Sequence, residues 1–206
     1  MAFNEAFIPG ATVVGITYKD GLVLGAERRV TLGGFIVSKN AKKTFKVTNS
    51  VGAACAGLIG DMEILIKELQ SYVRLREFEL RRPLPANSVA KLLSVIMFER
   101  RFAPMITQVM IGGISAKPSI WILDPLGSLI PDDYAAVGSG AEIAIGLVES
   151  GYSEDMTEDQ AKNLAVRAIR SAIKRDVSSG DGVDLLFVTK DGVREETASF
   201  QQPASS

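Results

Sequence analysis

The sequence contains no histidine, and its only cysteine is Cys55. Without histidine, the chain lacks the usual base of serine and cysteine hydrolases and the commonest ligand of zinc sites. A single cysteine excludes an internal disulfide and fits a reducing compartment. Because Cys55 stands in an apolar run, we expect it to be buried. Any general base must therefore be a carboxylate, a lysine or the amino terminus of the chain.

An excess of charge and long apolar runs are also missing. Lysine and arginine number 23 against 24 aspartates and glutamates, and this balance argues against nucleic acid as the main partner. No apolar run approaches the roughly 18 residues of a membrane span, and the residues before Ala11 lack the basic region and apolar core of a secretion signal. We therefore expect a soluble, cytoplasmic protein without a membrane partner.

The chain begins with a predicted β-hairpin that has a threonine almost at its start. Two apolar, β-branched runs, residues 12–18 and 22–26, are separated by Lys19-Asp20-Gly21. Asp-Gly between such runs is a strong hairpin signal, because glycine adopts the positive φ that a tight turn needs. The charged residues just past the hairpin are Glu27, Arg28, Arg29, Lys39, Lys42 and Lys43.

Two pairs of helices are predicted between runs of strands. Asp61 is expected to cap a helix whose apolar stripe is Met62, Leu65, Ile66, Leu69, Tyr72 and Val73. A second helix covers residues 89–97, a third begins at Gly138-Ser139-Gly140, and a capping box, Thr157-x-x-Gln160, precedes the fourth. The later strand-like runs are residues 35–38, 44–47, 51–56, 106–114, 119–123, 134–137 and 183–189, the last followed by a second Asp-Gly turn.

This order of elements predicts an α+β fold. Two antiparallel sheets pack on each other, and each helix pair covers one outer face, which gives a four-layer αββα sandwich. Residues 12–200 are expected to form one domain, preceded by a short leader, residues 1–11. The tail, residues 201–206, is expected to be flexible.

The layers, together with several segments, resemble the proteasome β-subunits of archaeal type, members of the N-terminal nucleophile hydrolases. The resemblance spans about residues 10–189. The segments that carry it are VVGITYKDGLVLGAERRVT, SKNAKKTFKV, AGLIGD, QVMIGGIS, YAAVGSGAEIAIGLVESGY and IKRDVSSGDGVDLLFV. It implies a sandwich of N-terminal nucleophile hydrolase type and threonine-type endopeptidase chemistry, without a cofactor or metal. In that family a leader is removed autocatalytically after a glycine, which exposes the catalytic threonine.

The family's chemistry suits a chain without histidine. A free α-amino group titrates near pH ~8 and serves as the base for its own hydroxyl, while a lysine held by a carboxylate stabilises the alkoxide. The resemblance assigns the carboxylate to Glu27, the lysine to Lys43 and the oxyanion N–H to Gly57, with Arg29 beside the site. Ser139, Asp176 and Ser179 match the polar set that orients the amine and a water. The residues implied to line an apolar substrate pocket are Val30, Ala41, Cys55 and Ile59.

The sequence departs from the family at the nucleophile, because Ala11 follows Gly10 where the catalytic threonine stands. Thr12 carries the nearest hydroxyl and is the candidate nucleophile if the chain is cut at the Ala11–Thr12 bond. One residue along a strand moves the side chain by about 3.3 Å and turns it to the other face. Such a displacement can cost on the order of a hundredfold in rate, unless a bulge at the chain start corrects it.

Three functions remain open at this point. The chain is a ring subunit that matures at Thr12 and acts as a threonine endopeptidase, a silent ring subunit that shapes the chamber, or a small-molecule hydrolase outside a proteasome. The last is weakest, because the motifs are those of ring-forming subunits. The resemblance implies heptameric β-rings, of mixed composition given Ala11, stacked between α-type rings and fed unfolded polypeptide by an unfoldase ATPase.

Each of these residues taken alone also has a plainer explanation. Thr12 is then an ordinary strand residue, and the charges from Glu27 to Lys43 are a solvated strand end and loop. Gly138-Ser139-Gly140 lacks the third glycine of a dinucleotide fingerprint and the Lys-Ser/Thr pair of a phosphate loop. It is the occurrence of all the site residues together, at the family's spacing, that favours the functional interpretation.

Overall fold

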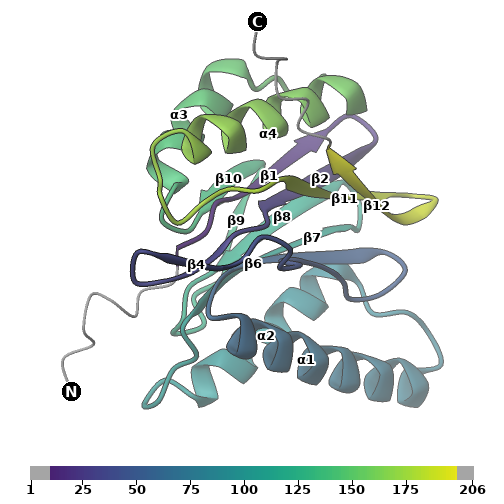
Figure 1. The fold of residues 1–206 in the computed structure, drawn as a ribbon. Coiled ribbons are helices and arrows are strands. Elements are labelled where there is room, and N and C mark those ends of the chain that lie inside the picture. Colours follow the sequence, from purple (N-terminus) through teal and green to yellow (C-terminus); the bar gives the residue numbers. More distant parts are fainter. Residues whose placement is uncertain (1–9, 199–206) are drawn as a thin grey trace, which may run out of the picture.

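The computed structural model describes residues 10–198, so most of the expected leader and the whole expected tail lie outside the described residues. Two five-stranded antiparallel sheets pack face to face, and a helix pair covers the outer face of each (Figure 1). The predicted α+β, four-layer sandwich is confirmed. Within residues 10–198, no helix is long and apolar enough to cross a membrane.

The first sheet contains the start and the end of the described chain. Its strand order is β10-β1-β2-β11-β12. The strands are β1 (Val13–Tyr18), β2 (Gly21–Glu27), β10 (Tyr134–Val137), β11 (Val183–Thr189) and β12 (Gly192–Ala198). Helices α3 (Ala141–Gly151) and α4 (Glu158–Ile173) pack on its outer face. The capping box is confirmed, since the Thr157 and Gln160 side chains each accept a hydrogen bond from the other residue's backbone N–H.

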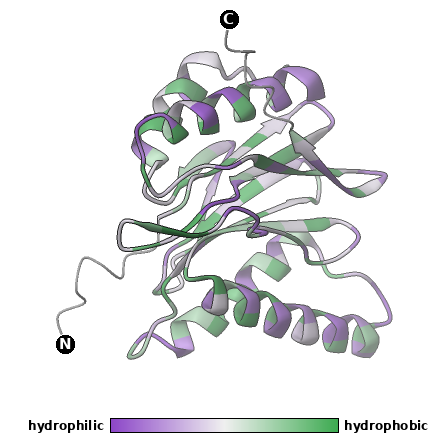
Figure 2. Cartoon of the chain, in the orientation of Figure 1, coloured by the Kyte–Doolittle hydropathy of each residue, from purple (hydrophilic) through white to green (hydrophobic). Residues whose placement is uncertain are grey.

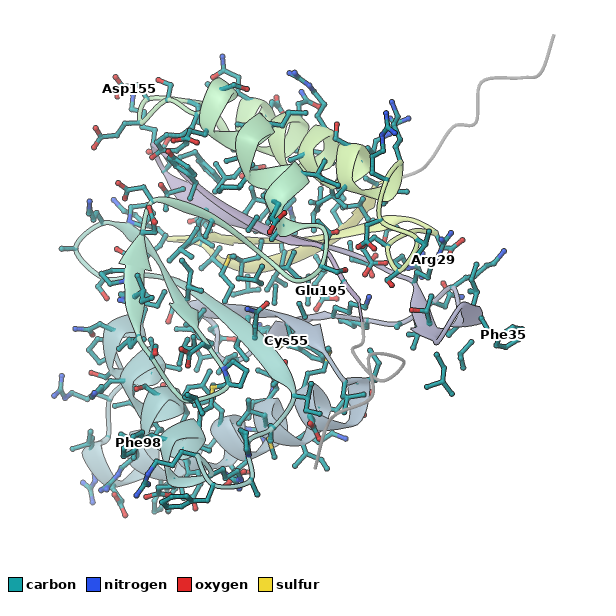
Figure 3. The ribbon with its side chains drawn as sticks, turned by 90° about the vertical axis from the view of Figure 1, so that its left-hand side faces the viewer. Arg29, Phe35, Cys55, Phe98, Asp155 and Glu195 are labelled. Atoms are coloured by element: carbon teal, nitrogen blue, oxygen red, sulfur yellow. The ribbon has the colours of Figure 1, made fainter. Side chains whose placement is uncertain are left out.

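The second sheet is built from the middle of the chain, in the order β5-β6-β7-β8-β9. The strands are β5 (Thr44–Lys46), β6 (Val51–Gly57), β7 (Thr107–Ile114), β8 (Pro118–Leu123) and β9 (Ile130–Asp132). Helices α1 (Ile59–Leu80) and α2 (Ala86–Glu99) cover it. A separate hairpin, β3 (Val30–Leu32) and β4 (Phe35–Ser38), protrudes from the body with Phe35 at its tip (Figure 3). Among the described strands, sequence patterns missed the three-residue strands β3 and β9, and they predicted β12 only as the second arm, without bounds, of the hairpin that begins with residues 183–189.

The core alternates along the strands as a period of two requires. In and before β1, Ala11 and Val13 pack between the two sheets, whereas Val14 and Ile16 pack toward α3 and α4. The buried apolar residues of α4, such as Leu164 and Ile169, pack toward the first sheet. Figure 2 shows apolar and polar residues mixed along α1 and α2, which also expose apolar side chains such as Phe78 and Phe98. Cys55 is fully buried among the side chains under α1 and α2, as expected.

Three local expectations are wrong. The predicted hairpin forms, with its turn at Lys19 and Asp20, but Gly21 has no positive φ. It pairs with Tyr18 at the start of β2, and a Cβ there would lie 2.5 Å from the Val188 carbonyl oxygen. Asp61 does not cap α1, which begins at Ile59; its carboxylate accepts a hydrogen bond from the Ile106 N–H at 2.7 Å. Tyr72 is 46% exposed and lies outside the buried stripe of that helix. Close packing against Val188 therefore explains the glycine at position 21, where the local signal suggested a positive φ, and a tertiary hydrogen bond explains Asp61, where it suggested a helix cap.

Candidate active site

Ala11 lies at the end of the first sheet, held on both sides of its backbone. Its N–H donates to Ser139 Oγ at 3.1 Å, and its carbonyl oxygen accepts from the Gly140 N–H at 3.3 Å. Both partners belong to the turn between β10 and α3. The methyl group of Ala11 is fully buried and packs between the sheets. The residue at the expected nucleophile position is thus fixed, but it offers only a methyl group.

Glu27 and Lys43 form a buried ion pair between the two sheets. Their side chains are 0% and 1% exposed. The Lys43 ammonium donates to Glu27 Oε1 and, at 2.6 Å, to the Arg29 carbonyl oxygen. Glu27 Oε2 accepts from the Arg29 N–H at 2.7 Å and from the Gly180 N–H at 2.9 Å. The structure therefore brings the two residues together as the resemblance implies.

Burial dominates the titration of this pair. It raises the pKa of Glu27 and lowers the pKa of Lys43, because each charged form is taken out of water. The charge and hydrogen bond of the partner act in the opposite direction in both cases. The negative charge of Asp176 also raises the pKa of Lys43, though by less than Glu27 does.

Asp176 is the centre of a second cluster, in the loop after α4. Its Oδ2 accepts hydrogen bonds from Ser139 Oγ at 2.6 Å and from Ser179 Oγ at 2.7 Å. Its Oδ1 accepts from the Ser178 N–H at 3.0 Å. The three residues that the resemblance groups therefore meet in the structure: Ser139 and Ser179 both donate to the Asp176 carboxylate, and Ser139 also contacts Ala11.

Thr12 belongs to this second cluster. It is fully buried, and its Oγ1 lies 2.7 Å from Ser179 Oγ. Its backbone oxygen accepts from the Glu27 N–H at 3.2 Å, in continuation of the β1–β2 ladder. Lys43, by contrast, directs its described hydrogen bonds to Glu27 and Arg29. The only hydroxyl in residues 10–12 is thus engaged with Ser179.

Arg29 connects the two clusters. Its Nε donates to Asp181 Oδ2 at 2.7 Å, and one terminal nitrogen donates to the Val177 carbonyl oxygen at 3.0 Å. The hydrogen bond to Asp181 raises the pKa of Arg29. Figure 3 shows Arg29 between the loop after α4 and the protruding β3–β4 hairpin. This arginine therefore fixes the loop that carries Asp176 and Ser179.

Gly57 ends β6 beside a mainly apolar cleft. Its φ of +146° favours glycine, and a Cβ at this position would lie 2.1 Å from the Ile106 carbonyl oxygen, so both features require glycine. The cleft has a volume of about 350 Å³ and is lined by Ala56, Gly57, Ile106, Thr107, Gln108, Pro125, Gly138 and Ser139. The predicted oxyanion donor and the serine that holds Ala11 thus line the same cleft.

The four residues predicted for the substrate pocket differ in accessibility. Val30, Ala41 and Ile59 are half-buried, whereas the Cys55 side chain is completely buried and its burial raises the pKa of the thiol. The Cys55 N–H donates to the Lys43 carbonyl oxygen at 2.9 Å. The Cys55 backbone therefore holds the backbone of Lys43 in place. The substrate pocket formed by the four residues stays a prediction.

Sequence patterns missed two members of the site. Gln108 Oε1 accepts from the Gly138 N–H at 2.9 Å, which ties β7 to the turn that holds Ala11. The Gly180 N–H donates to Glu27. The only signal for Gln108 in the sequence was its place as a polar residue at the start of the apolar run QVMIGGI. The Gly180 N–H gave no signal, because every residue except proline has a backbone N–H and the sequence does not show which of them donates to the site.

Comparison with known proteins identifies the family. Residues 9–188 match the proteasome family, described as proteasome subunit. The chain belongs to the proteasome subunit family. It is 51% identical to proteasome subunit beta 1 of Nitrosopumilus maritimus, over 95% of this chain and 98% of that protein. It is 52% identical to proteasome subunit beta 1 of Cenarchaeum symbiosum, over 91% and 97% of the two chains. Proteasome subunit beta 2 of Pyrobaculum aerophilum is 47% identical, over 93% of this chain and 95% of that protein.

These similarities confirm the predicted family as the archaeal-type proteasome β subunits. The chain is accordingly a β-type subunit of the 20S core particle, a protease complex of the threonine type. The small-molecule hydrolase is thereby the least supported of the three functions.

Proposed function

We propose that this β subunit is catalytically silent at its own site and serves to shape the chamber and support active neighbours. It assembles with α-type subunits and with a second β-type subunit in mixed heptameric rings. The particle resides in the cytoplasm, and an unfoldase ATPase feeds it unfolded polypeptides. The observation that carries this proposal is the burial of the Ala11 methyl group at the nucleophile position, while the Thr12 hydroxyl is engaged with Ser179.

The rest of the machinery supports a site that lacks only a hydroxyl. With threonine at position 11 and the leader removed, the terminal amine would take the hydroxyl proton as the oxygen attacks a peptide carbonyl carbon. Lys43 would stabilise the alkoxide, and the Gly57 N–H would stabilise the oxyanion. The proton then passes to the leaving amine, and water hydrolyses the resulting ester. Ser139, Asp176 and Ser179 orient the amine during these steps.

Maturation at Thr12 is the second candidate. In its favour, the Thr12 hydroxyl contacts Ser179, which in turn bonds the Asp176 carboxylate, so that a proton acceptor lies two hydrogen bonds away. Against it, Thr12 lies on the same side of the strand as Val14 and Ile16, which pack toward the helices. Cleavage at the Ala11–Thr12 bond would therefore need a rearrangement of the chain start.

The deciding experiment determines the intact mass and N-terminal sequence of the chain after co-assembly with its α-type and β-type partners. We expect no cut that depends on Thr12 in the unaltered chain. In the Ala11→Thr variant, we expect a new terminus directly after Gly10 and a gain of peptidase activity. Ala11→Val is the matched control, because valine has the shape of threonine without its hydroxyl. A terminus at Thr12 that disappears in the Thr12→Val variant would instead establish the second candidate.

A further inference from the structure

We infer that Thr12 is a positioning residue whose hydroxyl, through Ser179 and Asp176, fixes the neighbouring residue 11 in the site. The inference rests on the proposed function, in which residue 11 occupies the nucleophile position. It gives Thr12 a task other than that of nucleophile. Two series of hydrogen bonds end at the Asp176 carboxylate: one begins at the Thr12 hydroxyl and passes through Ser179, and the other begins at the Ala11 N–H and passes through Ser139.

The direction of each hydrogen bond follows from the chemistry of the groups. An ionised carboxylate only accepts, so Ser179 uses its single hydroxyl proton to donate to Asp176 Oδ2 at 2.7 Å. At the 2.7 Å contact between the two hydroxyls, Thr12 must then be the donor and Ser179 the acceptor. The Thr12 proton is thereby committed to Ser179.

A second arm reaches the same oxygen from residue 11. Ser139 donates to Asp176 Oδ2 at 2.6 Å and accepts from the Ala11 N–H at 3.1 Å. Residues 11 and 12 are consequently both tied to one carboxylate, the first through its backbone nitrogen and the second through its side chain. Such connected networks hold their members more strongly than isolated bonds do.

The packing around Thr12 leaves little room for another arrangement. The side chain is fully buried, and a Cβ on Gly140 would lie only 2.1 Å from Thr12 Oγ1. The absence of a side chain at Gly140 thus makes the space that the hydroxyl occupies. Because side chains alternate along a strand, fixing Thr12 on the helix side also fixes residue 11 on the side between the sheets.

The test uses the assembled particle with Ala11→Thr as the parent and compares Thr12→Val with Thr12→Ser. Loss of one buried hydrogen bond corresponds to about a three- to tenfold effect on a rate. We expect Thr12→Val to slow self-cleavage after Gly10 and to lower kcat by about that factor, with KM nearly unchanged. Thr12→Ser, which keeps the hydroxyl, should stay within about twofold of the parent.

Thr17→Val is the matched control on the same strand. Thr17 is also buried, and its hydroxyl lies 3.1 Å from the Tyr152 hydroxyl at the far end of β1. The control removes a comparable hydrogen bond away from the site, so kcat should not change. Equal kcat in Thr12→Val and its parent, or an equal loss in Thr17→Val, would overturn the inference.

A second measurement separates this inference from the proposed function. Failure of Ala11→Thr to cleave itself or to gain activity would count against the proposed function. In that event, hydrogen exchange of the amides of residues 11–14 in the particle with Ala11 decides the inference. Thr12→Val should speed this exchange about three- to tenfold, whereas Thr12→Ser and Thr17→Val should leave it as in the unaltered chain. Unchanged exchange in Thr12→Val would refute the positioning role.

Discussion

The two clusters of the site are held in different ways. Glu27 ends a strand of the first sheet and Lys43 precedes a strand of the second, so their ion pair joins the sheets, and it is almost completely buried. The Asp176 cluster draws only on the half of the molecule that contains the first sheet, and its burial is uneven: Asp176 is half-buried and Ser139 is exposed, whereas Thr12 and Ser179 are fully buried. In the Glu27–Lys43 pair, two buried opposite charges stabilise each other. In the Asp176 cluster, a single carboxylate is stabilised by hydrogen bonds from two hydroxyl groups and one backbone N–H.

The comparison predicts unequal sensitivity to mutation. Removal of one partner from a buried ion pair leaves an uncompensated charge in a medium that solvates it poorly. In the Asp176 cluster, water can still reach the Asp176 carboxylate and the Ser139 hydroxyl when one partner is removed. The Glu27–Lys43 pair should therefore dominate the stability of the site, although both clusters serve the same chemistry.

The largest effect is expected for Lys43→Met. The substitution leaves the Glu27 carboxylate buried without its cation, which should lower the free energy of unfolding by roughly 3–5 kcal/mol. Lys42→Met is the matched control at the adjacent position, where the lysine pairs with Glu195 and both side chains are about half exposed, 52% and 48%. Its loss should be at most about 1 kcal/mol. Urea unfolding of the three proteins measures the difference, and similar losses for the two variants would contradict the comparison.

The cost of Lys43→Met should depend on pH. Burial already raises the folded-state pKa of Glu27 above its ordinary value of 4.5, and loss of the lysine removes an influence that lowers it. A group whose pKa is raised on folding contributes stability below its unfolded pKa and loses it as pH rises through the folded pKa. The deficit of Lys43→Met should thus be small near pH 4.5 and grow toward neutral pH. Urea unfolding over that range measures it, and in Glu27→Gln/Lys43→Met the dependence should disappear.

Part of this organisation was predictable from the sequence, for identifiable reasons. The helix pairs and long strands repeat apolar residues at regular spacing, and the capping box at Thr157 is a local hydrogen-bond pattern. The positive φ predicted for Gly21 was wrong because the close approach of the Val188 carbonyl, and not a turn conformation, requires glycine there. The helix cap predicted for Asp61 was wrong because its carboxylate makes a tertiary hydrogen bond to the Ile106 N–H. Pairing of Glu27 with Lys43 followed from the family resemblance alone, since periodicity does not reveal which strand ends meet. Gln108 and the Gly180 N–H became visible only once the sheets were packed.

An intermediate effect is expected for Asp176→Asn. The amide has one oxygen in place of two, so it cannot accept from both serines and from the Ser178 N–H at once. One donor loses its partner, and because the cluster is partly exposed we expect a loss of about 1–2 kcal/mol. Asp155→Asn, at an exposed turn (Figure 3), should change stability by less than about 0.5 kcal/mol. A loss from Asp176→Asn as large as that from Lys43→Met would mean that burial does not separate the clusters.

The smallest effect should come from Gln108→Met, and it separates two explanations of the comparison. Gln108, like the ion pair, links the sheets, because its side chain on β7 accepts from the Gly138 N–H at 2.9 Å. Unlike the ion pair it is neutral and half-buried, so loss of the acceptor should cost only about 1 kcal/mol in urea unfolding. Gln108→Glu keeps an acceptor and should cost less. If Gln108→Met instead approached the loss of Lys43→Met, the number of links between the sheets, rather than buried charge, would set the sensitivity of the site.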